Sequence, residues 1–265
     1  MILIDGKPDA CVPASDSSVL RGDGVFEALR TFDGAPFALV DHLDRLAASA
    51  LPMGLALPSP ETLAGWVHEA ADPDGPGIVR IIVTRGDDVV SSRTIVMSQP
   101  VPDVPSPFTV VPVNAPWHPA GRRWNLAGVK TLSYAPNLDA SRQAHSAGFS
   151  DALLLDDDGI ILEGPTFSIA WLREGALETP SLELGILASI TRRQVLDLAQ
   201  EMGVGVRTGR FEISSLNDAT DLVAVSTVKQ VTSIERCGTL RPPSTGFDLQ
   251  LRASFLTMVE EQLGG

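Results

Sequence analysis

Cysteine is scarce in this sequence of 265 residues. Its two cysteines, Cys11 and Cys237, belong to no C-x-x-C pair and to no Cys/His cluster. A disulfide framework and a structural zinc site are therefore not expected. A chain of this length can bury a large apolar core without either. Cysteines used in this way suit a reducing cytoplasm, where we expect the protein to be found.

Long apolar runs and basic clusters are missing as well. Met1-Ile-Leu-Ile is followed at once by Asp5-Gly6, which is too short for the core of a signal peptide. No stretch approaches the roughly 18 to 20 apolar residues that cross a bilayer. The formal net charge is −13, and the arginines form no dense block. We therefore expect neither a membrane nor a nucleic acid as a partner.

Several common catalytic signatures are absent. There is no G-x-S-x-G elbow, no P-loop and no H-E-x-x-H motif. The four histidines are scattered without ligand spacing, so no metal is expected. Gly22-Asp-Gly24 falls short of a dinucleotide fingerprint, because it lacks the third glycine and the strand–helix context.

Lysine is rare, and this makes one segment conspicuous. Of 20 basic residues only three are lysine: Lys7, Lys130 and Lys229. Lysine can do what arginine cannot, namely lose its proton and act as a nucleophilic amine. Lys130 also lies four residues before Tyr134, the only tyrosine. A Schiff-base enzyme needs such a lysine, with a hydrogen-bond donor nearby. Taken alone, however, a Lys–Tyr pair of this kind is more often found on a protein surface.

Two further features could bind a charged ligand. Glu163 ends the apolar run Ile160–Leu162, where a carboxylate is unfavourable unless it is paired, for example with a protonated pyridine nitrogen. Ser189 or Thr191 can cap the amphipathic helix predicted over 190–202, whose first amides could bind an anion. A solvated glutamate and ordinary helix capping explain the same residues. Ser226-Thr227 and Arg45 could add phosphate contacts, or could equally be turn residues and a surface ion pair.

The hydrophobic pattern and the turn residues predict a two-domain α+β protein. The Pro-rich stretch 98–107 marks a linker, which places an N-terminal α/β domain at residues 1–102 and a C-terminal domain at 103–265. Residues 78–84 read as a strand buried on both faces, and 151–163 as a β-hairpin that 168–172 extends into a meander. The other predicted elements are helices at 41–54, 60–71, 138–147, 190–202 and 249–263, and strands at 1–5, 108–113 and 222–226.

Taken together and in this order, these segments resemble the class IV aminotransferases, the fold-type IV enzymes that use pyridoxal 5'-phosphate. The resemblance runs from Met1 to Leu240. Besides the Lys130 and Glu163 blocks and Ser226-Thr227, the matching segments are Arg21–Glu27, Asp41–Leu46, Ile81–Gly86 and Gly185–Arg192. These blocks in this order are far more specific than any one of them.

The resemblance implies a homodimer of two-domain chains, each with a smaller N-terminal α/β domain and a larger, mixed β-barrel-like C-terminal domain with helices. It implies that pyridoxal phosphate lies in the cleft between the domains, bound by the second. Lys130 would form the Schiff base and carry the proton. The remaining cofactor contacts would be Tyr134 at the phenolate, Glu163 at the ring nitrogen, and Arg45, Ser189, Ile190, Thr191, Ser226 and Thr227 at the phosphate. Arg80 and Phe26 would contact the substrate.

The sequence departs from the family pattern in three places. Ser168 stands where the family often has Asn, and Ala188-Ser189 replaces a common Pro-Gly. Ser92-Arg93-Thr94 lacks the histidine of the Arg-x-His pair typical of bacterial D-amino-acid aminotransferases. These departures put the details of the phosphate loop and a standard D-amino-acid specificity in doubt.

These residues are compatible with two reactions and with one non-catalytic function. An aminotransferase would move an amino group from an amino acid or amine to a 2-oxo acid, with Lys130 as general acid–base. A 4-amino-4-deoxychorismate lyase would eliminate pyruvate to give 4-aminobenzoate. A non-catalytic binding protein of the same fold is the third possibility. We favour the aminotransferase.

Overall fold

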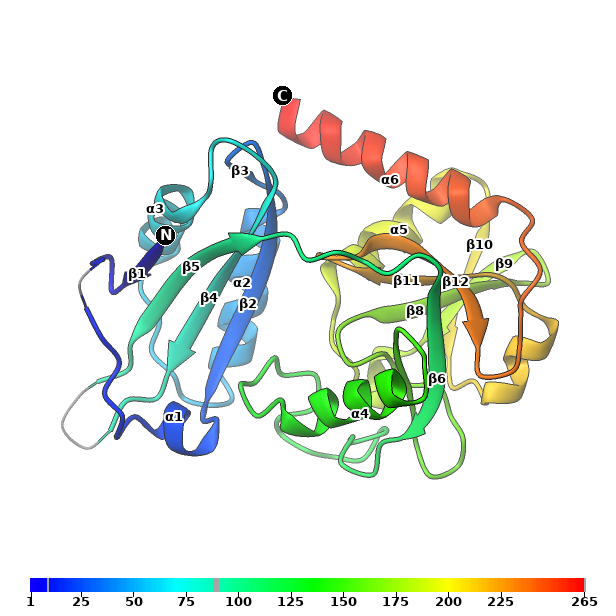
Figure 1. The fold of residues 1–265 in the computed structure, drawn as a ribbon, viewed down its shortest axis with the longest axis horizontal. Helices are drawn as coiled ribbons and strands as arrows, with labels where there is room; N and C mark the ends of the chain where they lie inside the picture. Colours follow the sequence, from blue (N-terminus) through cyan, green and yellow to red (C-terminus); the bar gives the residue numbers. More distant parts are fainter. Residues whose placement is uncertain (9, 88–90, 265) are drawn as a thin grey trace. The chain divides into compact units, whose positions relative to one another are not determined.

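The computed structural model describes residues 1–8, 10–87 and 91–264. The chain divides into two compact units (Figure 1). Unit 1 comprises Met1–Pro102 together with Gly128–Tyr134, and unit 2 comprises Asp103–Ala127 with Ala135–Gly265. The segment with Lys130 thus packs with the N-terminal residues, although it follows the proline-rich stretch in sequence.

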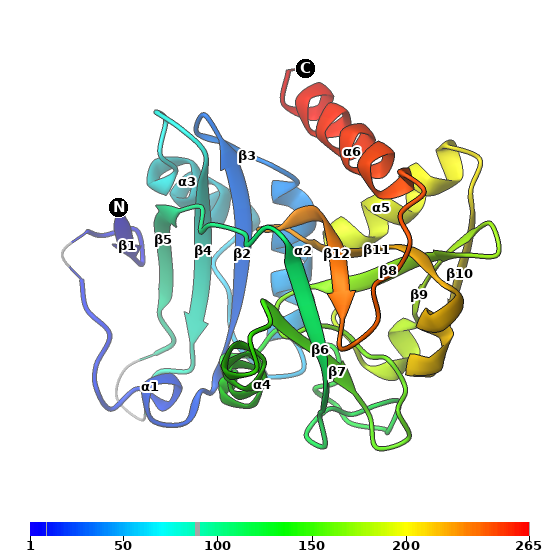
Figure 2. The same ribbon diagram turned by 45° about the vertical axis from the view of Figure 1, so that its right-hand side comes forward.

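Unit 1 is built on a five-stranded antiparallel sheet of order β1-β5-β4-β2-β3. The strands are β1 (Ile2–Ile4), β2 (Gly24–Phe32), β3 (Ala35–Pro36), β4 (Gly77–Thr84) and β5 (Thr94–Pro100). The helices are α1 (Ser17–Arg21), α2 (Leu39–Ala50) and α3 (Pro60–Ala70). Apolar side chains of α2 and α3 form one core with those of the sheet, so these helices cover one of its faces (Figure 2).

One-sided burial sets the sequence pattern of this sheet. In β2 the buried Val25, Glu27 and Leu29 alternate with partly exposed residues. β4 was expected to be buried on both faces, but Arg80 and Ile82 are partly exposed, so that prediction is wrong. The reason is that an antiparallel sheet can have helices packed on one face while its other face stays partly exposed.

Unit 2 contains a seven-stranded mixed sheet of order β10-β9-β8-β11-β12-β6-β7. The strands are β6 (Phe108–Asn114), β7 (Asp151–Leu155), β8 (Ser168–Arg173), β9 (Ala176–Pro180), β10 (Gly205–Gly209), β11 (Thr220–Ser226) and β12 (Gln230–Cys237). The helices are α4 (Ala135–Ser146), α5 (Ile190–Glu201) and α6 (Phe247–Gly264), with 3-10 turns η1 (Leu182–Leu184) and η2 (Ile213–Asp218). No helix within the described ranges is long and apolar enough to span a bilayer.

The hairpin predicted over 151–163 is confirmed. The N–H of Leu162 donates to Leu154 O at 3.0 Å, and the N–H of Leu154 donates to Glu163 O at 2.9 Å. The predicted meander is wrong, because β8 pairs with β11 and β9 instead of extending this hairpin. A tight turn, in which the Gly164 N–H donates to Phe167 O at 2.7 Å, redirects the chain between them.

Candidate active site

The segment that carries Lys130 runs along β2. The Phe26 N–H donates to Lys130 O at 3.0 Å, and the Leu132 N–H donates to Gly24 O at 2.9 Å. From the α2 side, Ser49 Oγ accepts a hydrogen bond from the Lys130 N–H at 3.3 Å. The backbone of Lys130 is therefore held by a strand and a helix of unit 1.

The structure brings three of the predicted site residues together. Lys130 Nζ lies 4.4 Å from the centroid of the Phe26 ring, a cation–π distance. The Phe26 ring meets the Tyr134 ring edge-on, with centroids 5.7 Å apart. Arg80 pairs with Ala28 in the sheet, and Ile82 pairs with Phe26. Because side chains alternate along a strand, Arg80 lies on the same face of the sheet as Phe26.

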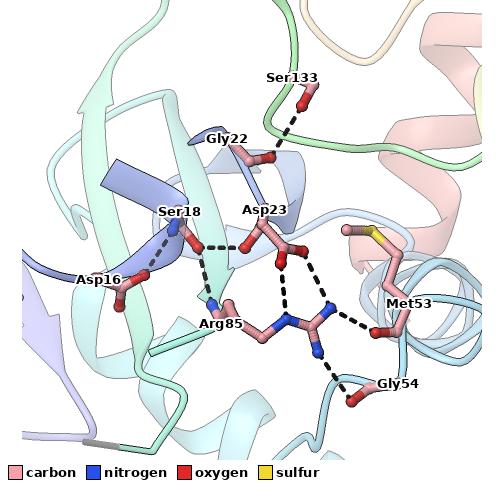
Figure 3. Close-up of polar contacts among 8 residues, drawn as sticks. All are labelled: Asp16, Ser18, Gly22, Asp23, Met53, Gly54, Arg85 and Ser133. Atoms are coloured by element: carbon pink, nitrogen blue, oxygen red, sulfur yellow. Dashed lines mark hydrogen bonds and ion pairs between the residues drawn. The ribbon is translucent and has the colours of Figure 1, made fainter. Parts of the chain in front are cut away.

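A salt-bridged loop precedes β2 (Figure 3). Arg85 binds both carboxylate oxygens of Asp23, with Nε–Oδ2 and Nη2–Oδ1 distances of 3.0 Å. The same guanidinium donates to the carbonyls of Met53 at 2.6 Å and Gly54 at 3.3 Å. One arginine at the end of β4 thus fixes both the loop before β2 and the chain after α2.

This loop also contacts the Lys130 segment. Ser133 Oγ donates to Gly22 O at 3.1 Å, as Figure 3 shows. Gly22 has a φ of +72°, and a Cβ there would lie 2.9 Å from Ser133 Oγ. Glycine at this position therefore allows both the left-handed backbone and the close approach.

Replacing Gly24 with alanine should disturb the Lys130 segment. The new Cβ would lie 2.5 Å from Val83 O and 2.6 Å from Leu132 Cδ1. We expect Gly24→Ala to lower the free energy of unfolding by about 1–3 kcal/mol, as overpacking does. Chemical denaturation measures this loss. Gly65→Ala is the matched control, since nothing lies within 4 Å of its Cβ, and equal destabilisation of both variants would contradict the prediction.

A buried charged cluster joins β2 to α2. The Glu27 side chain is 0% exposed and accepts hydrogen bonds from Arg45 Nε at 2.7 Å and from Arg45 Nη2 at 2.8 Å. His42 Nδ1 lies 2.8 Å from Glu27 Oε2. Burial raises the pKa of Glu27, but the Arg45 and His42 hydrogen bonds outweigh it and hold that pKa at about 2. Burial lowers the pKa of His42, against the opposing effect of Glu27.

Sequence reasoning missed Glu27 and His42. The helical spacing of His42 and Arg45 places both on one face of α2, but only the packing of α2 on β2 brings Glu27 opposite them. Arg45 is predicted to contact phosphate, and the carboxylate holds its guanidinium in a fixed orientation. Its role toward phosphate stays a prediction.

Glu27→Gln should destabilise the protein by about 3–5 kcal/mol at neutral pH, because it removes the buried negative charge that is paired with the largely buried Arg45. The folded-state pKa of about 2 lies below the ordinary value of 4.5. The stabilisation from ionised Glu27 is therefore complete above pH 4.5 and is lost as the pH falls towards 2. The difference in the free energy of unfolding between variant and wild type should therefore shrink as the pH falls from 7 to 3. A constant difference would contradict this, and exposed Glu69→Gln should show no such pH dependence.

Glu163 in unit 2 is held by backbone and side-chain groups. Its carboxylate oxygens accept from the Leu187 N–H at 3.2 and 3.3 Å, and its side chain is 15% exposed. His118 Nε2 lies 3.6 Å from Glu163 Oε1. Because His118 Nδ1 accepts from the Ala120 N–H at 3.1 Å, the proton of the neutral ring is on Nε2, toward Glu163. His118 carries no sequence signal, since it lies in the long loop before α4.

The Glu163–Leu187 bond places this carboxylate close to the start of α5. Ser189 caps the helix by accepting the Arg192 N–H at 3.2 Å, so Ser189 is the cap and not Thr191. The amides of Ile190 and Thr191, in the first turn, have no partner within the helix and are suited to an anion.

Ser226 and Thr227 begin the turn after β11. Ser226 Oγ accepts the Lys229 N–H at 3.0 Å, which closes the turn. Helix α5, which begins at Ile190, packs on β11, the strand that ends at this turn. Hydroxyl contacts of this turn to a phosphate stay a prediction.

The side chain of Lys229 is largely buried, with 13% of it exposed, among polar and aromatic groups. Its Nζ donates to Thr166 Oγ1 at 2.6 Å, lies 3.8 Å from Asp151 Oδ2 and faces the rings of Phe108 and Phe167. Burial lowers the pKa of Lys229, and Asp151 acts in the opposite direction. A lowered pKa therefore occurs at a lysine that is not predicted to form the Schiff base. Among the described residues, no group of three His, Cys, Asp or Glu side chains could hold a metal ion.

Known proteins resemble this chain over most of its length. The model of the amino-transferase class IV family matches residues 24–237. A putative branched-chain-amino-acid aminotransferase of Methanocaldococcus jannaschii is 31% identical over 257 residues, with 88% of this chain and 86% of that protein covered. A bifunctional aminodeoxychorismate lyase / D-amino acid transaminase of Mycobacterium tuberculosis is 30% identical over 273 residues, with 92% and 91% covered.

The chain also resembles solved structures of aminotransferases. A hypothetical aminotransferase from Mycobacterium tuberculosis in a PLP-bound form superposes with a TM-score of 0.89 at 26% identity, with 99% of both chains covered. A hypothetical aminotransferase from Mycobacterium tuberculosis in a form with α-ketoglutarate and PMP bound superposes with a TM-score of 0.90 at 26% identity. The chain therefore belongs to the class IV aminotransferase family and has the fold-type IV structure.

Proposed function

We propose that this protein is a pyridoxal phosphate-dependent aminotransferase that moves an amino group between an amino acid or amine and a 2-oxo acid. One observation carries the proposal. The Lys130 amine lies on the face of Phe26 beside Tyr134, on a segment fixed by β2 and α2. A nucleophilic amine in a fixed position, with a phenol close by, is what a carbonyl cofactor requires.

The chemistry of the side chains fits each functional group of pyridoxal phosphate. Lys130 Nζ would bind the aldehyde carbon, and Tyr134 would hydrogen-bond the phenolic oxygen. The Glu163 carboxylate would accept the ring N–H, and among the described residues it forms an ion pair only with a histidine, at 3.6 Å. The amides of Ile190 and Thr191 would bind the phosphate. Ser189, Ser226, Thr227 and Arg45 complete the proposed phosphate set.

Pyridoxal phosphate, when bound, supplies an electron sink for the bonds at the substrate Cα. The chain supplies the proton transfers and the orientation. Lys130, once its Nζ is free, would take the proton from the substrate Cα and deliver it to the aldehyde-derived carbon of the cofactor as general acid–base. The negative charge of Glu163 would keep the ring nitrogen protonated.

Substrate binding would use the sheet face that carries Phe26. Arg80, on the same face, offers a guanidinium for a substrate carboxylate. A relative described with α-ketoglutarate bound supports a 2-oxo acid as the acceptor. The homodimer stays a prediction.

A lyase is the second candidate, because one relative is named as both an aminodeoxychorismate lyase and a D-amino acid transaminase. Adding single D- or L-amino acids to the cofactor-loaded protein tests the first proposal, since transamination removes the aldehyde absorbance. Release of pyruvate from aminodeoxychorismate, without that loss, would favour the lyase. A protein that stays colourless with added cofactor would contradict both.

A further inference from the structure

Arg192 is buried in the first turn of α5. Its side chain is folded back on the end of β9, where Nε donates to Thr179 Oγ1 at 3.0 Å and Nη2 donates to Pro180 O at 2.7 Å. The residue is 6% exposed. These bonds tie the start of the helix to the sheet of unit 2.

The charge of Arg192 is not balanced by a direct partner. In the part of the chain that the structure describes, both of its hydrogen-bond acceptors are neutral, and it forms no ion pair with a carboxylate. Burial lowers the pKa of Arg192, and only the more distant Glu163 acts against this. A buried cation without an anion is unfavourable.

The helix makes this position even less favourable for a positive charge. The N-terminus of a helix carries a partial positive charge, which disfavours a cation in the first turn. The first turn of α5 contains no acidic residue that could offset it. Two positive sources thus belong to one helical turn: the partial charge of the helix end and the buried charge of Arg192.

We propose that Arg192 is a positioning residue that makes the start of α5 selective for a doubly charged phosphate. It holds the first turn against β9, and its buried charge adds to that of the helix end, so a bound dianion offsets both. This inference rests on the proposed function, in which the phosphate of the cofactor lies at Ile190 and Thr191. Its consequence is a preference for pyridoxal phosphate over pyridoxal that depends on the charge at position 192.

The test compares the full-length apoprotein in four forms: wild type, Arg192→Gln, Arg192→Lys and Arg193→Gln. Arg193 is an exposed arginine in the same turn and serves as the matched control. Dissociation constants for pyridoxal phosphate and for pyridoxal are measured at fixed ionic strength by absorbance titration. Circular dichroism confirms folding of each variant.

Arg192→Gln should weaken pyridoxal phosphate binding at least about tenfold, while pyridoxal binding changes less than about threefold. Arg192→Lys and Arg193→Gln should keep the wild-type ratio of the two constants. Equal weakening of both ligands by Arg192→Gln would show a purely structural role and overturn the proposal.

A second variant keeps the test valid if Arg192→Gln does not fold. Thr179→Asp would place a carboxylate at the oxygen that now accepts Arg192 Nε, and so neutralise the guanidinium in place. It should reduce the preference for the phosphorylated ligand as Arg192→Gln does, and an unchanged preference would overturn the inference. Failure of the wild type to bind either ligand would instead contradict the proposed function.

Discussion

Lys130→Ala is expected to lower turnover by at least about 10³-fold, because it removes the amine that both binds the aldehyde and moves the proton. Borohydride reduction of the cofactor-loaded protein should label the wild type and leave this variant unlabelled. The fold should persist, since the Lys130 backbone keeps its hydrogen bonds to β2 and Ser49. Steady-state kinetics and mass spectrometry of the reduced protein measure the two effects.

Lys229→Ala is the matched control for this prediction. Chemistry should remain largely intact, while the free energy of unfolding falls by about 1–3 kcal/mol because the buried Asp151 loses its cationic partner and Thr166 loses a hydrogen bond. If Lys229→Ala abolished labelling and Lys130→Ala did not, the assignment of the lysine would be wrong.

Glu163→Gln should give the second largest loss. A neutral amide cannot stabilise a proton on the ring nitrogen, so kcat should fall by about 10²-fold or more while the lysine still binds the aldehyde. The Leu187 N–H can still donate to the amide oxygen, which keeps the local structure. Single-turnover spectra separate cofactor binding from the chemical step.

Glu183→Gln, at an exposed position in η1, provides the comparison for Glu163→Gln. It should leave kcat within about twofold, as surface substitutions usually do. A Glu163→Gln variant with wild-type kcat would remove the ring-nitrogen role from Glu163.

Local sequence signals predicted those parts of the fold that depend on neighbouring residues. Ser59 followed by Pro60 marked the start of α3, and Ser59 Oγ accepts the Thr62 N–H at 3.2 Å. The acidic-Gly turn at 156–159 marked the hairpin. The sequence did not predict the strand β2, by contrast, because Arg, Glu and Ala interrupt its apolar residues.

The residues of the candidate site likewise fall into those that local sequence signals identify and those that only the tertiary structure reveals. The scarcity of lysine and the apolar run before Glu163 pointed to both residues without any structure. Glu27, His42, His118 and Arg192 could not be found in this way, since each acquires meaning only from a partner distant in sequence or from burial against another element.

By itself, the sequence determined the chemistry available to this protein: a rare lysine close to the only tyrosine, a carboxylate after an apolar run, and a capped helix start. Only the tertiary structure decided which of these side chains meet and which charges are balanced. The physical reason is that periodicity and capping act over a few residues, whereas the pairing of strands and the burial of ions depend on segments far apart in the chain.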